Sequence, residues 1–543
     1  MNKLSYSFLL ASGFAFGQFF EQNKAFTKQD TLKGSDTEYR NFWDVKKYDL
    51  SVEPDFKSKS IKGNNTIVFT ITKDITNPVF QIDLQRPMKA DKVECSFPVK
   101  GDFKRDGDFI FITANKNFKK GEKYTIDVAY SGNPLIAKNA PWDGGWVFTK
   151  DEKGNPWMSV ADEGIGASIW LPVKDIWSDE PENGIVMKII TPSDLVGIGN
   201  GRLTDKKTVN GKNIFTWEVK NTINAYSIIP NIGKYVNFKD SYNGENGKLD
   251  LDYWVIEYNL DKAKKQFQQV KPMLKAFEYW FGPYPFYEDS YKLVDSPYLG
   301  MEHQSNIAYG NQYVNGYLGT DLSGTGVGLN WDYIIVHESG HEWFANNITV
   351  KDQADMWVHE GFTMYSEVLF TENYMDKKSA ETYAQGIQNS INNDVPIIGK
   401  YGVRNEGSGD MYPKGASMLH TIRQIINNDE KFRQILRGLN KDFYHQTVTT
   451  EQIEKYISEK SGIDFSSIFN QYLRTTKVPV LEYSQNGTEL KYRFTDVIKN
   501  INLPIRFSDQ MISPTESWQK ITLKNANPVK FNKNYYLRYK KIN

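Results

Sequence analysis

The pentapeptide His337-Glu338-Ser339-Gly340-His341 places two histidines four residues apart, and eighteen residues separate His341 from Glu360. Residues four apart lie about 40° apart around a helix, with Cβ atoms roughly 6 Å from each other, so both imidazoles can reach one ion. A second helix can bring in Glu360 as the third ligand. The stretch therefore predicts a catalytic zinc site with one ion per chain, bound by His337, His341 and Glu360.

Glu338 stands beside the first ligand and is predicted to be the general base of the site. A zinc ion held by two imidazoles and one carboxylate keeps a coordination position open for water, whose pKa falls to near 7. Glu367 follows Glu360 by seven residues, which is two helical turns along the same face. It is a candidate to accept a hydrogen bond from a ligand histidine, and the alternative is a solvated surface glutamate.

Length and charge limit the classes of protein to which the chain can belong. Its 543 residues exceed what one hydrophobic core usually serves, and domains of about 150 residues predict roughly three to four of them. Lys plus Arg and Asp plus Glu number 66 each. This balance gives no electrostatic reason to expect nucleic acid or an anionic membrane surface as a partner. Composition does not set the oligomeric state.

The first seventeen residues are predicted to be a secretory signal peptide. Lys3 precedes a mostly apolar run from Leu4 to Phe16, and small residues surround the expected cleavage point before Gln18. A buried N-terminal helix is the alternative. No later segment offers about eighteen uncharged apolar residues, so no membrane span is expected. Cys95 is the only cysteine and excludes an intrachain disulfide. We therefore expect a periplasmic or secreted protein stabilised by its core and its metal.

Periodicity divides the rest of the chain into three parts after a polar lead-in at 18–45. Apolar and polar residues alternate, as in strands, within an N-terminal β domain at 46–247. This domain has predicted strands at 48–52, 66–71, 79–84 and 124–130. A catalytic domain at 248–476 begins with a helical stripe that ends at Gly282-Pro283.

Further helical periods of the catalytic domain cover 333–344, 358–370, 416–426 and 450–473, with a short strand at 291–294. A small C-terminal β domain at 477–543 returns to strands at 489–494 and 535–539. The pattern predicts a multidomain α+β protein.

At this point the residues resemble the M1 family of zinc aminopeptidases. The family's HExxH-x18-E pattern matches the zinc set, and the flanking stretches 342–344 and 357–362 are similar to the family's usual surroundings. The segment at 281–285 is also similar to sequences of this family. The resemblance implies an N-terminal β-sheet domain, a thermolysin-like and mainly α-helical catalytic domain, and a small C-terminal β domain.

The segment Leu299-Gly300-Met301-Glu302-His303 resembles the family's GxMEN motif, whose glutamate binds the free α-ammonium of a peptide. The resemblance implies that Gly300, Met301 and Glu302 bind substrate, with Glu302 as the anchor for the amine. Leu299 and His303 depart from the motif. His303 and His359 both stand where family motifs have asparagine, and both are interpreted as hydrogen-bonded structural residues, not as ligands.

Two further positions follow from the resemblance. Tyr412, in Tyr412-Pro413-Lys414-Gly415, resembles the family's tyrosine that stabilises the oxyanion of the tetrahedral intermediate. Glu163, in the loop at 162–164, looks like the second glutamine or glutamate that the β domain supplies to the amine. A packed core tyrosine and a surface-loop glutamate are the respective alternatives.

The resulting hypothesis is a zinc-dependent aminopeptidase acting on peptides with a free N-terminus. A zinc endopeptidase of the thermolysin-like type would share the metal set but would need no amine anchor. A catalytically silent interaction module of the same family is the alternative outside enzymes. The sequence does not give the preferred residue at the first substrate position, because pocket walls come from scattered residues. The resemblance also leaves open an epoxide hydrolase side activity, which one branch of the family has.

Overall fold

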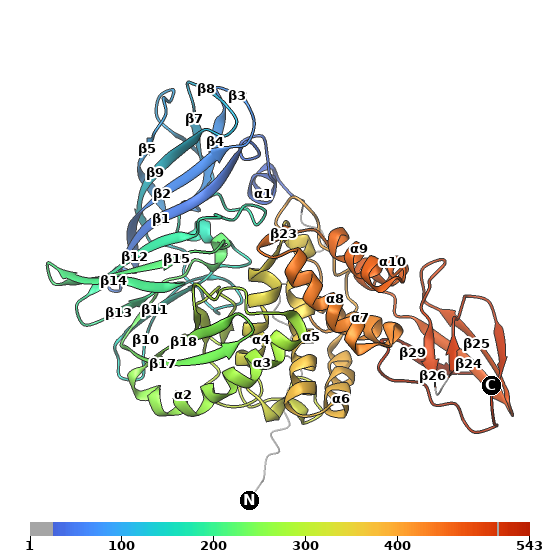
Figure 1. Cartoon of the computed structure of the whole chain (residues 1–543). Coiled ribbons are helices and arrows are strands. Elements are labelled where there is room, and N and C mark those ends of the chain that lie inside the picture. Colours follow the sequence, from blue (N-terminus) through green and yellow to red (C-terminus); the bar gives the residue numbers. More distant parts are fainter. Residues whose placement is uncertain (1–24, 508–509, 543) are drawn as a thin grey trace, which may run out of the picture.

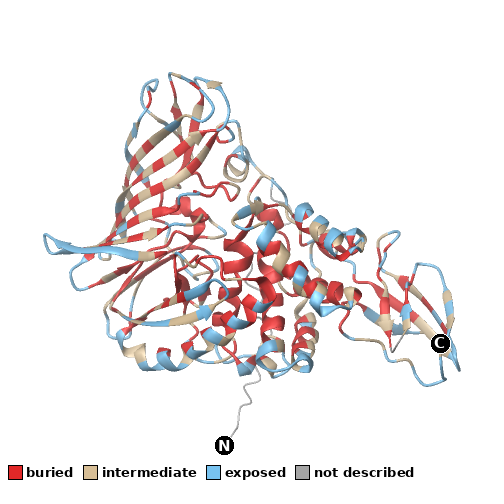
Figure 2. Ribbon diagram, viewed as in Figure 1, coloured by how far each residue is buried: buried red, intermediate tan, exposed pale blue. Residues whose placement is uncertain are grey.

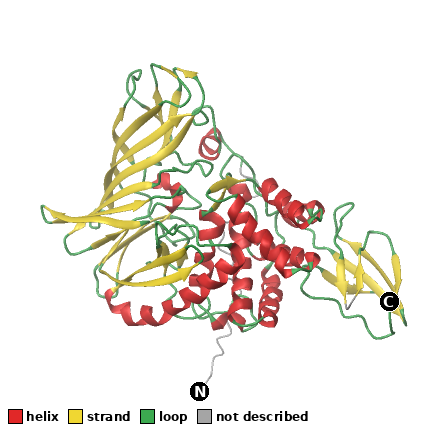
Figure 3. Cartoon of the chain, in the orientation of Figure 1, coloured by secondary structure: helices red, strands yellow, loops and turns green. Residues whose placement is uncertain are grey.

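The computed structural model describes residues 25–507 and 510–542 (Figure 1). The predicted signal peptide at 1–17 lies outside the described residues. A β-rich N-terminal part, a helical middle part and a smaller β module follow one another along the chain (Figure 3). This order confirms the predicted architecture. Among the residues described, no helix is long and apolar enough to cross a membrane.

The N-terminal domain is built on a seven-stranded sheet with the order β14-β15-β12-β1-β2-β9-β5. Its strands are β1 (Trp43–Asp55), β2 (Ser60–Ile71), β5 (Lys89–Cys95), β9 (Lys123–Gly132), β12 (Ile185–Pro192), β14 (Arg202–Val209) and β15 (Lys212–Val219). Along β1 and β2 the side chains alternate between buried and partly exposed, so each strand contributes one face to the core (Figure 2). The alternation of apolar and polar residues in the sequence therefore correctly predicted strands with one buried face.

Smaller sheets complete this domain. A four-stranded sheet has the order β10-β11-β16-β13, formed by β10 (Gly145–Lys150), β11 (Pro156–Ala161), β13 (Val196–Ile198) and β16 (Asn231–Gly233). The remaining strands are β3 (Ile75–Thr76), β4 (Val79–Asp83), β6 (Lys104–Asp106), β7 (Phe109–Thr113) and β8 (Asn117–Phe118). The loop after β11 carries Glu163 toward the catalytic domain.

The catalytic domain begins with a mixed sheet of order β17-β18-β19-β21-β20. These strands are β17 (Tyr235–Gly244), β18 (Gly247–Ile256), β19 (Tyr291–Asp295), β20 (Gly300–Met301) and β21 (Ile307–Tyr309). The predicted boundary at 247/248 falls one residue inside β18, which forms an antiparallel hairpin with β17. The hairpin joins the catalytic sheet through β18 and β19, so the domain begins near Tyr235. Alternation alone does not reveal which sheet a strand joins.

Helices form most of the catalytic domain (Figure 1). They are α2 (Leu260–Gln266), α3 (Val270–Phe281), α4 (Tyr333–Gly340), α5 (Trp357–Tyr374), α6 (Lys377–Ile387), α7 (Pro413–Ile426), α8 (Asp429–Asp442), α9 (Thr450–Ser461) and α10 (Ser466–Arg474). Every residue of α5 from Trp357 to Thr371 is buried, so α5 is the central helix. A parallel pair, β22 (Ile348–Val350) and β23 (Gln446–Val448), lies beside these helices.

The C-terminal module contains a four-stranded sheet of order β28-β25-β24-β29 and a two-stranded ribbon. Its strands are β24 (Val480–Asn486), β25 (Glu489–Thr495), β26 (Ile505–Phe507), β27 (Gln510–Ile512), β28 (Gln519–Thr522) and β29 (Arg538–Lys541). It shares one hydrophobic core with the catalytic helices. Tyr536 N donates to Thr421 Oγ1 on α7 over 2.9 Å, which attaches the module to the catalytic domain.

Four local predictions are corrected by the structure. The lead-in contains a capped helix, α1 (Lys28–Gly34), and β1 begins at Trp43. The helical period at 450–473 is two helices, because Gly462 adopts a left-handed φ of 73° and ends α9. The period at 333–344 ends as a regular helix at Gly340. The last strand covers 538–541 rather than 535–539.

Candidate active site

Helix α4 presents His337 and Glu338, and His341 occupies its C-terminal cap. The two imidazole centroids lie 5.1 Å apart, as expected for residues four apart. A Cβ at Gly340 would lie 2.6 Å from Ser366 Oγ on α5. Glycine therefore allows α4 and α5 to approach closely, and this approach brings Glu360 to the two histidines.

The three predicted ligands meet in one buried cluster. Glu360 Oε2 lies 3.6 Å from His337 Nε2 and 3.4 Å from His341 Nε2, and the candidate ligand atoms all lie within 4.8 Å of one another. No described residue donates a hydrogen bond to Glu360 Oε2. Burial alone would raise the pKa of Glu360, but the neighbouring His341 and His337 lower it below its ordinary value. This donor set fits a zinc ion with an open coordination position.

The other nitrogen of each imidazole already has a partner. His337 Nδ1 lies 2.6 Å from Glu367 Oε1, and the Tyr383 hydroxyl donates to Glu367 Oε2 over 2.6 Å. His341 Nδ1 lies 3.1 Å from the carbonyl oxygen of Phe344. Both rings are thereby oriented with Nε2 toward the cluster. Glu367 is fully buried, which excludes the surface-glutamate interpretation.

The irregular turn after α4 explains why the regular helix ends early. Phe344 and Ala345 have non-helical dihedral angles within η6 (Glu342–Asn346). The turn leaves the Phe344 carbonyl free to face His341. Sequence periodicity predicted a helix here because the buried side chains continue with a helical spacing. The backbone instead leaves the helix, and its Phe344 carbonyl contacts the ligand His341.

Glu338 lies on the side of the cluster that faces strand β20. Its carboxylate, the carboxylate of Glu302 and an imidazole nitrogen of His341 all lie within 4.8 Å of one another. Burial raises the pKa of Glu338 to about 7, and Glu302 acts in the same direction. A Cβ at Gly300 would lie 2.8 Å from Glu338 Oε1. Only glycine leaves room for the carboxylate of the predicted base beside this strand.

Glu302 and Glu163 reach the same space from different domains. Glu302 follows β20 and is 3% exposed, and its Oε1 has no partner among the described residues. Burial and the Glu302 carboxylate raise the pKa of Glu163 well above its ordinary value. Gln353 Nε2 donates to the Glu163 carbonyl over 3.2 Å, which ties the loop of the β domain to the catalytic domain. The two carboxylates thus act on each other, and no Lys or Arg side chain of the described residues forms an ion pair with either.

Tyr412 stands at the N-terminal cap of α7 with its ring stacked on His337 at 6.0 Å between centroids. A Cβ at Gly415 would lie 2.9 Å from Gly361 Cα, so paired glycines allow α5 and α7 to cross closely. Burial and the nearby Glu360 carboxylate raise the pKa of Tyr412 well above its ordinary value. The hydroxyl therefore stays protonated and can donate a hydrogen bond.

His303 and His359, which the sequence analysis interpreted as structural residues, belong to neither group of side chains that could hold a metal ion. His359 Nε2 accepts from Val350 N over 2.9 Å, and its ring stacks on Trp177 at 5.4 Å. His303 is fully buried, but neither of its ring nitrogens has a partner among the described residues, so the predicted hydrogen bond is not present. Burial lowers the pKa of each imidazole to about 3, so both are neutral.

Sequence reasoning missed two tyrosines that support the ligand His337. The Tyr333 hydroxyl lies 3.1 Å from His337 Nδ1, and Tyr383 reaches the same histidine through Glu367. Tyr333 precedes His337 by four residues, a spacing that could have identified it. Tyr383 lies on α6, and no local pattern connects it with the site.

Comparisons with known proteins agree with this geometry. Two family profiles match the chain, the Peptidase M1 N-terminal domain over 45–227 and the Peptidase family M1 domain over 258–472. Probable aminopeptidase 2 of Sulfurisphaera tokodaii is 22% identical over 460 residues, which cover 82% of this chain and 55% of that protein. Leucyl aminopeptidase of Saccharolobus solfataricus is 23% identical over 305 residues, covering 53% of this chain and 38% of that protein.

Among solved structures, the M1 zinc metallopeptidase of Deinococcus radiodurans has the same fold. It superposes with a TM-score of 0.68 at 19% identity, covering 81% of this chain and 95% of that one. The chain spans about half of the length of the curated relatives that it matches over most of its own length.

Proposed function

Because the chain belongs to peptidase family M1, we propose that it is a zinc-dependent aminopeptidase that removes the N-terminal residue from peptides. The observation that carries this proposal is the buried Glu302 carboxylate beside the predicted base Glu338 and the ligand His341. An amine anchor at that position places the first peptide bond of a substrate next to the metal site.

His337, His341 and Glu360 would hold the zinc ion. Bound zinc acts as a Lewis acid on the scissile carbonyl and lowers the pKa of a coordinated water. Glu338 takes the proton of the attacking water and later returns it to the leaving amine. Glu367 and the Phe344 carbonyl keep the two imidazoles in the orientation that binding requires.

The remaining residues would position the peptide. Glu302 and Glu163 accept hydrogen bonds from the α-ammonium, which supplies the cation that their facing carboxylates lack. The backbone of Gly300 and Met301 lies beside the substrate, and the protonated Tyr412 hydroxyl donates to the oxyanion of the tetrahedral intermediate. An endopeptidase would need no such anchor, and a silent module would need neither a filled metal set nor a buried base.

Replacing Glu302 by glutamine tests the proposal. We expect wild-type protein to hydrolyse a free peptide but not its N-acetylated form. Glu302→Gln should lower kcat/KM for the free peptide by about 10- to 150-fold, because charge-assisted hydrogen bonds contribute about 1.5–3 kcal/mol. The measurement is the rate of release of the first residue, followed by chromatography. Equal cleavage of the free and the blocked peptide by both proteins would leave the endopeptidase as the better description.

We also propose that the protein is exported. The apolar run from Leu4 to Phe16 after Lys3, with small residues before Gln18, supports this proposal. Mass spectrometry of the protein recovered outside the cytoplasm should find an N-terminus near Gln18. An intact Met1 in cytoplasmic protein, with none outside, would contradict export.

A further inference from the structure

Residues 302–306 form a buried turn, the anchor turn, which carries the proposed amine anchor. Glu302 is 3% exposed, and the four residues that follow it are fully buried. Asn306 N donates to His303 O over 2.9 Å, and Ser305 adopts a left-handed φ of 50°. A residue other than glycine seldom keeps this conformation unless its surroundings hold it there. The position of the anchor therefore depends on the groups that bind this turn.

The irregular turn after the metal-binding helix holds the anchor turn on one side. Asn346 Nδ2 donates to Glu302 O over 2.7 Å, and Ser305 N donates to Glu342 Oε1 over 2.9 Å. Asn346 and Glu342 both belong to η6, which follows the ligand His341. These two bonds join the backbone of the anchor turn to the segment that carries the metal ligands.

Lys292 on β19 holds the anchor turn on the other side. Its ammonium is fully buried and donates to Ser305 O over 3.0 Å, and to Gly199 O and Gly201 O over 2.8 and 2.6 Å. Gly201 N in turn donates to Ser305 Oγ over 2.8 Å. Lys292 Nζ also lies 4.4 Å from the centre of the Trp217 ring on β15. Because both glycines and Trp217 belong to the N-terminal domain, one side chain joins the anchor turn to that domain.

The buried charge of Lys292 has no carboxylate partner. Among the described residues, no Asp or Glu side chain forms an ion pair with its Nζ. An ammonium has three N–H donors, and the three carbonyl oxygens use all of them. Burying a charge is costly even when it is satisfied, and an apolar side chain of similar volume often serves stability as well or better. What a lysine adds at this position is the fixed arrangement of three backbone carbonyls.

We propose that Lys292 is a positioning residue for the amine anchor, because it fixes the anchor turn against the N-terminal domain and thereby places the Glu302 carboxylate. This inference rests on the proposed aminopeptidase function and adds the residue that positions its anchor. The Glu302 carboxylate lies within 4.8 Å of atoms of Glu338 and His341. A small displacement of the turn would therefore weaken the hydrogen bonds to the α-ammonium. Lys292 acts through the backbone, since its hydrogen bonds all go to carbonyl oxygens.

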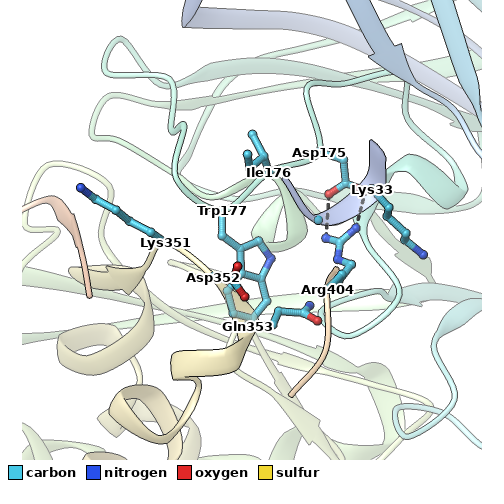
Figure 4. A pocket seen from close by; sticks show the side chains of 9 residues that line it. Lys33, Asp175, Ile176, Trp177, Lys351, Asp352, Gln353 and Arg404 are labelled. Carbon is cyan, nitrogen blue, oxygen red and sulfur yellow. Dashed lines mark hydrogen bonds and ion pairs between the residues drawn. The ribbon is translucent and has the colours of Figure 1, made fainter. Parts of the chain in front are cut away.

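Loss of the Lys292 ammonium should leave the two domains in contact. Arg404 forms two hydrogen bonds with the Asp175 carboxylate, at 3.0 and 2.9 Å (Figure 4). Gln353 Nε2 donates to the Glu163 carbonyl over 3.2 Å. Both contacts join the catalytic domain to the N-terminal domain without involving the anchor turn. We therefore expect Lys292→Met to keep its fold and its zinc content, with the change confined to the anchor turn.

Two inhibitors that differ only in the α-amine measure the anchor directly. Leucine hydroxamate and isocaproyl hydroxamate bind zinc through the same group, and only leucine hydroxamate has the amine. Wild-type protein should bind leucine hydroxamate about 10- to 100-fold more tightly, as expected for charge-assisted hydrogen bonds. Lys292→Met should lower this ratio of inhibition constants by at least about fivefold. Its affinity for isocaproyl hydroxamate should change by less than about twofold, whereas a general loss of structure would weaken both inhibitors alike.

Lys174→Met is the matched control for the removal of a buried lysine. Lys174 Nζ donates to Trp43 O over 2.6 Å, lies 4.8 Å from the centre of the Trp43 ring and pairs with Asp179. All three residues belong to the N-terminal domain and make no hydrogen bond to the anchor turn. The control should keep the wild-type ratio of inhibition constants even if its unfolding temperature falls.

Two further variants test whether Lys292 acts through the anchor. In Glu302→Gln protein, adding Lys292→Met should lower kcat/KM for a free peptide by less than about a further twofold, because coupled residues are not additive. Ser305→Ala removes only the oxygen that accepts from Gly201 N. This milder change should lower the inhibitor ratio by about two- to fivefold, and it decides the question if Lys292→Met does not fold.

The outcomes distinguish this proposal from the proposed function. If wild-type protein prefers leucine hydroxamate and both Lys292→Met and Ser305→Ala keep that preference, the assignment of Lys292 is wrong and the aminopeptidase function stands. Equal weakening of the two inhibitors in Lys292→Met would also overturn the assignment. If zinc-loaded wild-type protein binds both inhibitors equally and cleaves no peptide with a free amine, both proposals fail.

Discussion

Glu338→Gln is expected to lower kcat for peptide hydrolysis by about 10²- to 10⁴-fold, which is the contribution of a positioned general base. Glutamine is similar in size to glutamate but cannot take a proton from water. Burial gives the carboxyl of Glu338 a pKa of about 7 in the metal-free protein, and the neutral amide therefore imposes no new charge on its surroundings. KM should change by less than about threefold, because Glu338 is not expected to hold the substrate.

The measurement requires a steady-state assay together with zinc analysis of the same sample. Zinc content and the unfolding temperature should match those of the wild-type protein, since Glu338 is not one of the ligands. Glu451→Gln, at an exposed position of α9, provides a surface control for the same chemical change. A Glu338→Gln protein that keeps more than about a tenth of the wild-type kcat would exclude the assigned role.

The zinc site was the part of the structure most completely predicted from sequence. Helical spacing is local, so the separation of His337 and His341 sets their relative geometry wherever the helix lies. The same reasoning placed Glu367 on the face of α5 that carries Glu360, and the structure brings Glu367 to 2.6 Å from His337 Nδ1. Resemblance to a family supplied Glu302, Glu163 and Tyr412, which spacing alone does not single out.

The features that escaped prediction depend on contacts between distant segments. The domain boundary was misplaced because β18 pairs with β19 some forty residues later. Helix α4 ends at Gly340, and in the irregular turn that follows it the Phe344 carbonyl faces the His341 imidazole. No local sequence pattern predicts this contact.

Glycines connect these distant contacts with the chemistry of the site. Gly340 lets α4 approach α5, and Gly361 meets Gly415 where α5 crosses α7. Gly300 leaves space for the Glu338 carboxylate. An added Cβ would clash with α5 beside the metal ligands at Gly340, with the base Glu338 at Gly300, and with the start of α7 beside Tyr412 at Gly361. The precision of the cluster therefore depends on the close approaches that these glycines allow, against side chains at Gly300 and Gly340 and against backbone where Gly361 meets Gly415.

Removal of the metal is expected to abolish hydrolysis, and zinc should restore it. A chelator leaves three buried groups, Glu360 and the two histidines, without the ion that their geometry fits. Stoichiometric zinc should also raise the unfolding temperature, because a ligand that binds only the folded protein stabilises it. Full activity in protein shown by elemental analysis to contain no metal would contradict the assignment of this site.

Two substitutions in α5 distinguish the metal ligand Glu360 from Glu367, which orients the ligand His337. Glu360→Gln removes a charged ligand and should weaken zinc binding more than Glu367→Gln, for which a loss of about 10- to 100-fold in affinity is expected. Competition with a chromophoric chelator measures both affinities. Glu367→Gln should regain most of its activity when zinc is in excess, because Glu367 orients His337 but takes no part in proton transfer. Glu338→Gln should stay inactive at every zinc concentration. If excess zinc instead restored the activity of Glu338→Gln, Glu338 would contribute to zinc binding and its assignment as the general base would be wrong.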